Sequence, residues 1–286
     1  MDPVQWLVEH EGAEQVLIPI TKTGVIDLDF LTKVVATRGK EIAVISAMHS
    51  NNELGSIQPI AEIVKIAGDI PVHTDAVQSF GKVEFNFSKL EVTAATISAH
   101  KIGGPLGVAA LVLKRGLDLT PVLHGGGQER EIRSGTLNAP SIVAFTAAAE
   151  YAIANMASNF AKIRELRDYF IAGLKNCVPD FSINSVSDPA LPGIVNATFP
   201  GTESDALLLL LDTEGISASA GSACSAGVPR PSHVLVALGL SESDADASLR
   251  ISIGTTNTKS EIDQVLAVMP SVVERARNAF VVSELN

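Results

Sequence analysis

The run Val92-Thr93-Ala94-Ala95-Thr96-Ile97-Ser98 leads directly into Ala99-His100-Lys101-Ile102-Gly103-Gly104-Pro105-Leu106-Gly107. Its apolar and β-branched residues predict a buried strand, which the glycines and proline that follow bring to an end. Lys101 would then stand at the carboxyl end of a parallel strand, where α/β sheets bind their ligands. A lysine is most often a solvated surface charge. At this position it is a candidate for covalent catalysis.

Short segments rich in valine and isoleucine recur around this strand, bounded by glycine, proline, asparagine or charged residues; they are Val16–Ile20, Ile42–Met48, Pro71–Asp75 and Gly107–Leu113. Between two of them, Pro59–Ala67 has the apolar spacing of a helix, with proline suited to its first turn. Alternating strands and helices predict an α/β fold with a mostly parallel sheet.

The second half of the chain has a different pattern. An alanine-rich helical stretch runs from Ala139 to about Asn176 and would link two lobes. After it we expect strands at Gly193–Phe199 and Ser248–Ile253, a helix over Glu203–Asp212 and a final amphipathic helix from Lys259 to about Ala279. The chain therefore divides into a large domain over residues 1–150 and a smaller α+β domain over residues 151–286.

Composition excludes several functions. The 286 residues carry a formal net charge of -11 with no basic stripe, which argues against nucleic acid or an anionic membrane as a partner. Two cysteines cannot form a disulfide framework. Residues 1–10 lack the pattern of a leader, and no apolar run approaches the ~20 residues of a membrane span. Cytoplasm is the expected location.

Two polar segments end neighbouring predicted strands. Asp75 lies in His73-Thr74-Asp75-Ala76-Val77-Gln78-Ser79, and a carboxylate there can pair with the protonated ring nitrogen of pyridoxal phosphate (PLP). Taken alone, this aspartate would more often be a turn residue or a helix cap. The loop Ser46–Gly55 carries amide side chains that can donate to a phenolate oxygen or a carboxylate. Its other interpretation is a polar loop closed by Gly55, and Asn52 and Glu53 could be no more than loop residues.

Together with Lys101, these segments resemble the cysteine desulfurases of NifS/IscS type, in the class V aminotransferase group of fold-type I PLP enzymes. The resemblance covers nearly the whole chain, and the order and spacing of its short motifs are specific. The segments that carry it are 48–53, 73–79, Ser98-Ala99-His100-Lys101, His124-Gly125-Gly126-Gly127-Gln128-Glu129-Arg130, Arg133-Ser134-Gly135-Thr136, Gly221-Ser222-Ala223-Cys224-Ser225 and Leu249-Arg250-Ile251-Ser252.

The resemblance implies a role for each matched residue. Lys101 would hold PLP covalently, Asp75 would keep its ring nitrogen protonated, and Gln78 and Asn51 would contact its hydroxyl. Ser98 and His100 would touch the phosphate, and Thr136 would reach the cofactor of a neighbouring subunit in a homodimer. The catalytic candidates are Lys101, His100 and Cys224, and no metal is expected.

Cys224 and Arg250 would define the substrate. Cys224 lies among small residues in Ser217–Gly227, a segment that offers little side chain to pack, whereas Cys177 beside Val178 has the surroundings of a buried apolar residue. The resemblance makes Cys224 the nucleophile that takes sulfur from L-cysteine, leaving alanine and an enzyme persulfide. Arg250 would bind the substrate carboxylate, with Asn51 beside it, although a lone arginine on a strand is more often an ion-pair partner.

The expected activity is cysteine desulfurase, with a sulfur-acceptor protein such as an iron–sulfur scaffold as partner. The alternatives are a selenocysteine lyase, another class V enzyme such as a desulfinase, or a truncated inactive PLP-fold fragment that only dimerises or docks. Two departures from the family stand out. Leu106 replaces a usual basic residue and Ala109 a usual glycine. In addition, roughly the first quarter of the family's large domain, with part of its phosphate site, is expected to be absent.

Overall fold

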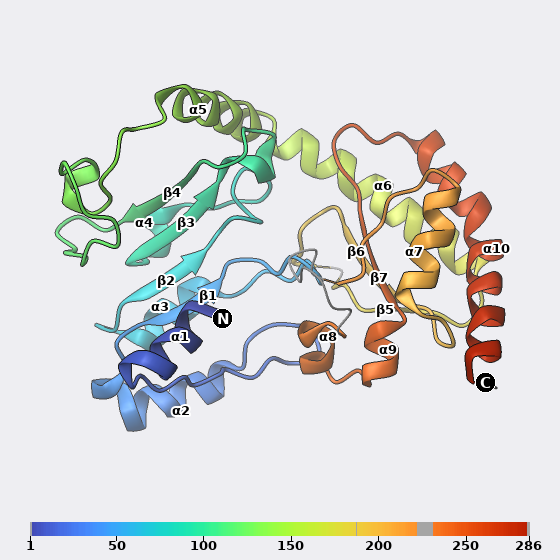
Figure 1. Cartoon of the computed structure of the whole chain (residues 1–286), viewed down its shortest axis with the longest axis horizontal. Helices are drawn as coiled ribbons and strands as arrows, with labels where there is room; N and C mark the ends of the chain where they lie inside the picture. Colours follow the sequence, from blue (N-terminus) through green and yellow to red (C-terminus); the bar gives the residue numbers. More distant parts are fainter. Residues whose placement is uncertain (1, 187, 222–230, 285–286) are drawn as a thin grey trace.

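The computed structural model describes residues 2–186, 188–221 and 231–284, and its strands form two separate sheets (Figure 1). The first sheet has the order β1-β2-β3-β4, with bounds β1 (Ile45–Met48), β2 (Val72–Asp75), β3 (Ala94–Ser98) and β4 (Ala109–Leu113). The first three strands are parallel, and β4 pairs with β3 in the antiparallel direction. The expected mostly parallel sheet in an α/β fold is therefore confirmed.

Helices and 3-10 turns precede, connect and follow the strands of this sheet, and some of them pack against it. Their bounds are α1 (Asp2–Glu11), α2 (Leu28–Arg38), η1 (Gly39–Glu41), α3 (Ile60–Ala67), α4 (Phe87–Leu90), η2 (Ala99–Ile102), η3 (Glu129–Glu131) and α5 (Ala139–Ala154). In Figure 1, α2 and α3 lie near one end of the sheet and α5 lies at the other, beyond β4. Leu31 of α2 and Ile60 and Ile63 of α3 pack with Ile45 and Val72 in one buried cluster. Removing this apolar area from water is the main force that holds the helices to the sheet.

The second sheet, of order β5-β6-β7, is antiparallel and has its own core. Its elements are β5 (Ser182–Ile183), β6 (Ile194–Thr198), β7 (Ser248–Ser252), α6 (Met156–Cys177), α7 (Ser204–Thr213), α8 (His233–Leu238), α9 (Glu242–Asp246) and α10 (Lys259–Glu284). Phe170, Phe199 and Leu249 are fully buried where α6, α7 and α10 meet the sheet. The expected strands and helices of this half are present within a few residues of their predicted bounds.

Two expectations about local structure were wrong. Val16–Ile20 forms no strand, because only Ile20 pairs, in a single bridge with Ile26, and Leu17 is exposed. The helical stretch after Ala139 is two helices, since Asn155 caps α5 by donating from Nδ2 to the Tyr151 carbonyl at 2.8 Å. The domain boundary expected after residue 150 falls inside α5 and stays a prediction.

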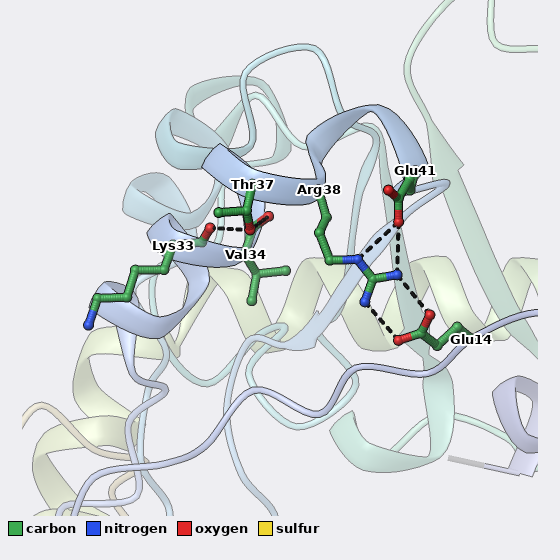
Figure 2. Close-up of polar contacts among 6 residues, drawn as sticks. All are labelled: Glu14, Lys33, Val34, Thr37, Arg38 and Glu41. Atoms are coloured by element: carbon green, nitrogen blue, oxygen red, sulfur yellow. Dashed lines mark hydrogen bonds and ion pairs between the residues drawn. The ribbon is translucent and has the colours of Figure 1, made fainter.

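A charged cluster fastens the segment after α1 to the end of α2 (Figure 2). The Arg38 guanidinium donates two hydrogen bonds of 2.7 Å to the Glu14 carboxylate and two, of 3.0 and 2.9 Å, to Oε2 of Glu41. This fork-to-fork geometry lowers the pKa of Glu14 and raises that of Arg38. The cluster lies beside a surface cavity of about 560 Å³ that contains none of the candidate site residues.

Within the described part of the chain, no helix combines the length and the apolar character needed to cross a membrane.

Candidate active site

Three of the predicted site residues line one cavity of about 760 Å³; they are Lys101, Gln78 and Arg250. It is lined from both halves of the chain, by η2 and the turn after β2 on one side and by β6, β7 and the residues after them on the other. No aspartate or glutamate lines it among residues 2–186, 188–221 and 231–284, although the chain has a net charge of -11. The cavity is therefore suited to an anionic ligand.

Lys101 lies in η2, directly after β3, as its sequence predicts. The turn that follows depends on two glycines for different reasons. Gly103 has a φ of 82°, which favours glycine, and a Cβ at Gly104 would stand 2.8 Å from the Ala99 Cβ. This tight turn places Lys101 beside the cavity while its backbone stays close to the sheet.

The other predicted cofactor residues gather at the same edge of the sheet. Asp75 is the last residue of β2, in register with Met48 of β1 and Thr96 of β3, so the three carboxyl ends lie together. Its side chain is exposed, and one oxygen accepts from the Val77 N–H at 2.9 Å. Ser98, at the end of β3, has its hydroxyl 2.7 Å from Nδ1 of the exposed His100. These residues border the site without lining the cavity.

Asn51 and Thr136 are placed differently from the cavity residues. Asn51 is buried, and its Oδ1 accepts from the N–H groups of Glu53 and Leu54 at 2.8 Å each, while Nδ2 points to the Met48 sulfur at 3.3 Å. Its neighbour Asn52 lines the cavity instead. Thr136 is exposed and does not line the cavity.

The backbone of Arg250 is fixed by hydrogen bonds on both sides, whereas its side chain is only partly hydrogen-bonded. On β7 it pairs with Asn196 of β6, and it exchanges two backbone hydrogen bonds with Ser219, of 3.1 and 2.7 Å. Its Nη1 donates to the Asn52 carbonyl at 3.3 Å. Its Nε is buried and has no hydrogen-bond partner in the described part of the protein. A buried guanidinium nitrogen without an acceptor is costly, which favours an anionic ligand beside it.

The two cysteines differ in what the structure describes. Cys224 falls within residues 222–230, outside the described residues. Cys177 closes α6 partly buried, with its sulfur 3.8 Å from the Leu174 carbonyl and 3.7 Å from that of Leu266. Burial raises the pKa of the Cys177 thiol, so it is a weak nucleophile, in agreement with the packing role expected for it.

Lys82 is a cavity residue that the sequence did not single out. It follows Gly81 in the turn after β2 and lines the same cavity as Lys101. Burial, together with the positive charge of Lys101, lowers the pKa of Lys82 to about 8. From the sequence, a lysine that follows a glycine is expected to be a solvated turn residue. Lys82 comes next to Lys101 only because β2 and β3 lie side by side in the fold.

Comparisons with known proteins agree with this geometry. Residues 1–265 match the family described as Aminotransferase class-V. The chain is 43% identical over 282 residues to the IscS-like cysteine desulfurase of Mycobacterium tuberculosis (strain ATCC 25618 / H37Rv), covering 98% of this chain and 72% of that protein. It superposes on a solved NifS-like protein with a TM-score of 0.87 at 33% identity, over 96% of this chain and 71% of the other.

A second solved structure, SspA in complex with cysteine, has a TM-score of 0.73 at 32% identity and covers 90% of this chain and 71% of that one. The class V family is PLP-dependent. From the family match, the identity to curated relatives and the common fold, the chain belongs to the class V aminotransferases and is a homologue of the IscS/NifS cysteine desulfurases.

Proposed function

We propose that the protein is a cysteine desulfurase, which removes sulfur from L-cysteine to leave L-alanine and a persulfide on Cys224. The observation that carries the proposal is the cavity shared by Lys101 and Arg250, with three cationic side chains and no acidic one among its described lining residues. The relative named above as a cysteine desulfurase, and the neighbour solved with cysteine, support this substrate.

The residues present suit PLP. Lys101 opens onto the cavity with Gln78, which makes no hydrogen bond within the described residues and is free to contact a ligand. Asp75 offers a carboxylate for the ring nitrogen at the end of the adjacent strand β2. Asn51 lies in the loop that follows β1, the strand paired with β2. The Ser98–His100 pair would hold the phosphate. When bound, PLP supplies an electron sink for charge that develops at the substrate Cα.

Each side chain then has a defined task. Lys101 moves the proton at the substrate Cα, because a lysine amine that lies beside the substrate can act as a general base. Arg250 binds the substrate carboxylate with its guanidinium group, whose Nε has no acceptor among the described residues. Cys224, as thiolate, attacks the substrate sulfur: a new S–S bond forms, the C–S bond breaks, and the released alanine takes up a proton.

A second copy of the chain would complete the assembly. Thr136 lies away from the cavity of its own chain, which supports the role of reaching a neighbouring subunit's cofactor. Exposed apolar side chains on α5 and beyond, among them Val143 and Tyr151, support a homodimer interface there. We place the enzyme in the cytoplasm, with a sulfur-acceptor protein such as an iron–sulfur scaffold receiving the persulfide sulfur.

Four variants test the proposal in the PLP-loaded protein. Lys101→Ala should abolish the visible absorbance of the lysine-bound cofactor and all alanine release from cysteine. Cys224→Ala should keep the absorbance and lose sulfide release. The matched controls Lys65→Ala and Cys177→Ala, at an exposed helix position and in a packed helix end, should keep both. Sulfide release by Cys224→Ala at the wild-type rate would contradict the persulfide mechanism.

A further inference from the structure

His73 forms two hydrogen bonds across the sheet to which the proposed reaction assigns no task. It lies in β2, between β1 and β3 (Figure 1), and both of these strands run parallel to it. Its Nδ1 is 2.9 Å from the Ser46 hydroxyl of β1, and its Nε2 is 2.9 Å from the Thr96 hydroxyl of β3. Both ring nitrogens of His73 are therefore hydrogen-bonded, and this one side chain joins the three parallel strands.

Asp75 lies on the same face of the sheet as His73, because it is two residues further along β2. The opposite face carries Ile45, Val72 and Ala95, which pack in the cluster with α2 and α3. Burial lowers the pKa of His73, and the negative charge of Asp75 offsets part of that shift. The side chains of His73 and Asp75 are therefore close enough for their charges to interact.

The sheet offers no other group that could take over this interaction. β1, β3 and β4 contain only apolar, serine and threonine residues, so His73 and Asp75 are the only titratable residues in the four described strands. The titratable residues just beyond the carboxyl ends of the parallel strands have other partners or positions; they are His49, His100 and Lys101. Asp75 is therefore the charged group that acts on His73.

Hydrogen bonds from both neighbouring strands fix the backbone around Asp75. On the β3 side, Thr96 contacts His73 through its hydroxyl, and its carbonyl accepts from the Ala76 N–H at 2.9 Å. On the β1 side, the Asp75 carbonyl accepts from the His49 N–H at 2.7 Å. One oxygen of the Asp75 carboxylate accepts from a backbone N–H, and its Oδ2 makes no hydrogen bond among the described residues. The backbone of Asp75 is thus held from both sides, while one carboxylate oxygen is available to a ligand.

We propose that His73 is a positioning residue for the Asp75 carboxylate, because its ring links β2 to both neighbouring strands on the face that carries Asp75. This inference rests on the proposed function, in which Asp75 keeps the ring nitrogen of PLP protonated. A binding site keeps its geometry when surrounding hydrogen bonds lock the residues that support it. A neutral imidazole also places no competing positive charge beside Asp75, so the carboxylate interacts fully with the ring nitrogen.

Four variants separate this bridge of hydrogen bonds from general packing. His73→Phe keeps a flat ring and removes both hydrogen bonds, whereas His73→Gln keeps a neutral polar end group. Ser46→Ala and Thr96→Val each remove one hydroxyl and leave the imidazole in place. His10→Phe makes the same replacement as His73→Phe at an exposed position of α1, and it serves as the matched control.

The experiment makes three measurements on the full chain. NMR titration of the His73 ring in the cofactor-free protein, with and without Asp75→Asn, measures the interaction between the two side chains without any turnover. Titration of the cofactor-free protein with PLP gives the dissociation constant of the cofactor. NMR of bound PLP that is isotopically labelled at its ring nitrogen shows, at each pH, whether that atom carries a proton.

We expect Asp75→Asn to lower the pKa of His73 further, because it removes the negative charge that raises it. His73→Phe should weaken PLP binding about tenfold, a loss of the kind that small misplacements of interacting groups cause. The PLP bound to His73→Phe should also lose its ring proton at a lower pH than in the wild type. His73→Gln should recover most of the affinity, and His10→Phe should change neither quantity. Ser46→Ala and Thr96→Val should each weaken binding, and adding either to His73→Phe should weaken it no further.

An unchanged His73 pKa in Asp75→Asn would overturn the inference, and so would wild-type PLP affinity and ring protonation in His73→Phe. Equal losses of affinity in His73→Phe and His73→Gln, with normal ring protonation in both, would show a merely structural role and contradict it. If His73→Phe fails to fold, Thr96→Val decides the matter, because it leaves the ring in place and wild-type affinity there would overturn the inference. Wild-type protein that binds no PLP or releases no alanine from cysteine would refute the proposed function instead, and the NMR titration would still test the interaction of His73 with Asp75.

Discussion

Replacing Lys82 with methionine should stabilise the cofactor-free protein at neutral pH. Lys82 lines the cavity beside Lys101, and burial with this like charge lowers its pKa from the ordinary 10.5 to about 8. At pH 7 the folded protein must therefore carry an ammonium in poorly hydrated surroundings. Because a pKa change of one unit equals about 1.4 kcal/mol, the ammonium costs about 3 kcal/mol of stability.

The pH dependence gives the prediction its sign. Between about pH 8 and pH 10.5 the unfolded chain binds more protons at Lys82 than the folded protein does, so wild-type stability rises with pH in that range. The stabilisation of Lys82→Met should thus be about 3 kcal/mol at pH 7 and shrink to about 1 kcal/mol at pH 10. Urea unfolding at the two pH values measures it, with Lys65→Met as the control at an exposed position.

The reasoning would be refuted if Lys82→Met were no more stable than the wild type at pH 7, or if its advantage were the same at pH 10. Either result would mean that Lys82 is solvated in the folded protein, and that the cavity is less positive than its lining residues indicate.

Three further outcomes follow from packing and charge. Arg250→Lys should raise the KM for cysteine about tenfold with a smaller change in kcat, because an ammonium lacks the planar fork that binds a carboxylate. Steady-state alanine release measures both constants, and an unchanged KM would contradict the role of Arg250 in binding the carboxylate. Gly193→Ala should destabilise the protein by about 3 kcal/mol, because the new Cβ would lie 2.1 Å from the backbone carbonyl oxygen of Ile253. Urea unfolding measures the loss, and an unfolding midpoint equal to that of the wild type would show that the strands can shift to make room. Leu174→Ala, at a fully buried site, should cost about 2–5 kcal/mol, against almost nothing for Leu209→Ala on the exposed side of α7.

Local patterns predicted most of the elements near the site. The β-branched run before Lys101, the strand ending at Asp75 and the helix after Pro59 all formed within a few residues of their expected positions. These segments were predictable because a buried strand needs a continuous apolar run and an amphipathic helix needs one apolar face. Val16–Ile20 has the composition of a strand but pairs only at the Ile20–Ile26 bridge, and hydrogen bonding to a neighbour is a property of the fold.

The sequence by itself determined the chemical groups of this protein: a lysine after a strand, an aspartate at the end of the next strand, an arginine on a late strand and a cysteine among small residues. Only the tertiary structure decided which of them share a cavity. Lys82 and His73 gained their surroundings from residues distant in sequence, Lys101 and Thr96 respectively. Burial and charge–charge proximity arise from packing between elements, and no local pattern encodes them.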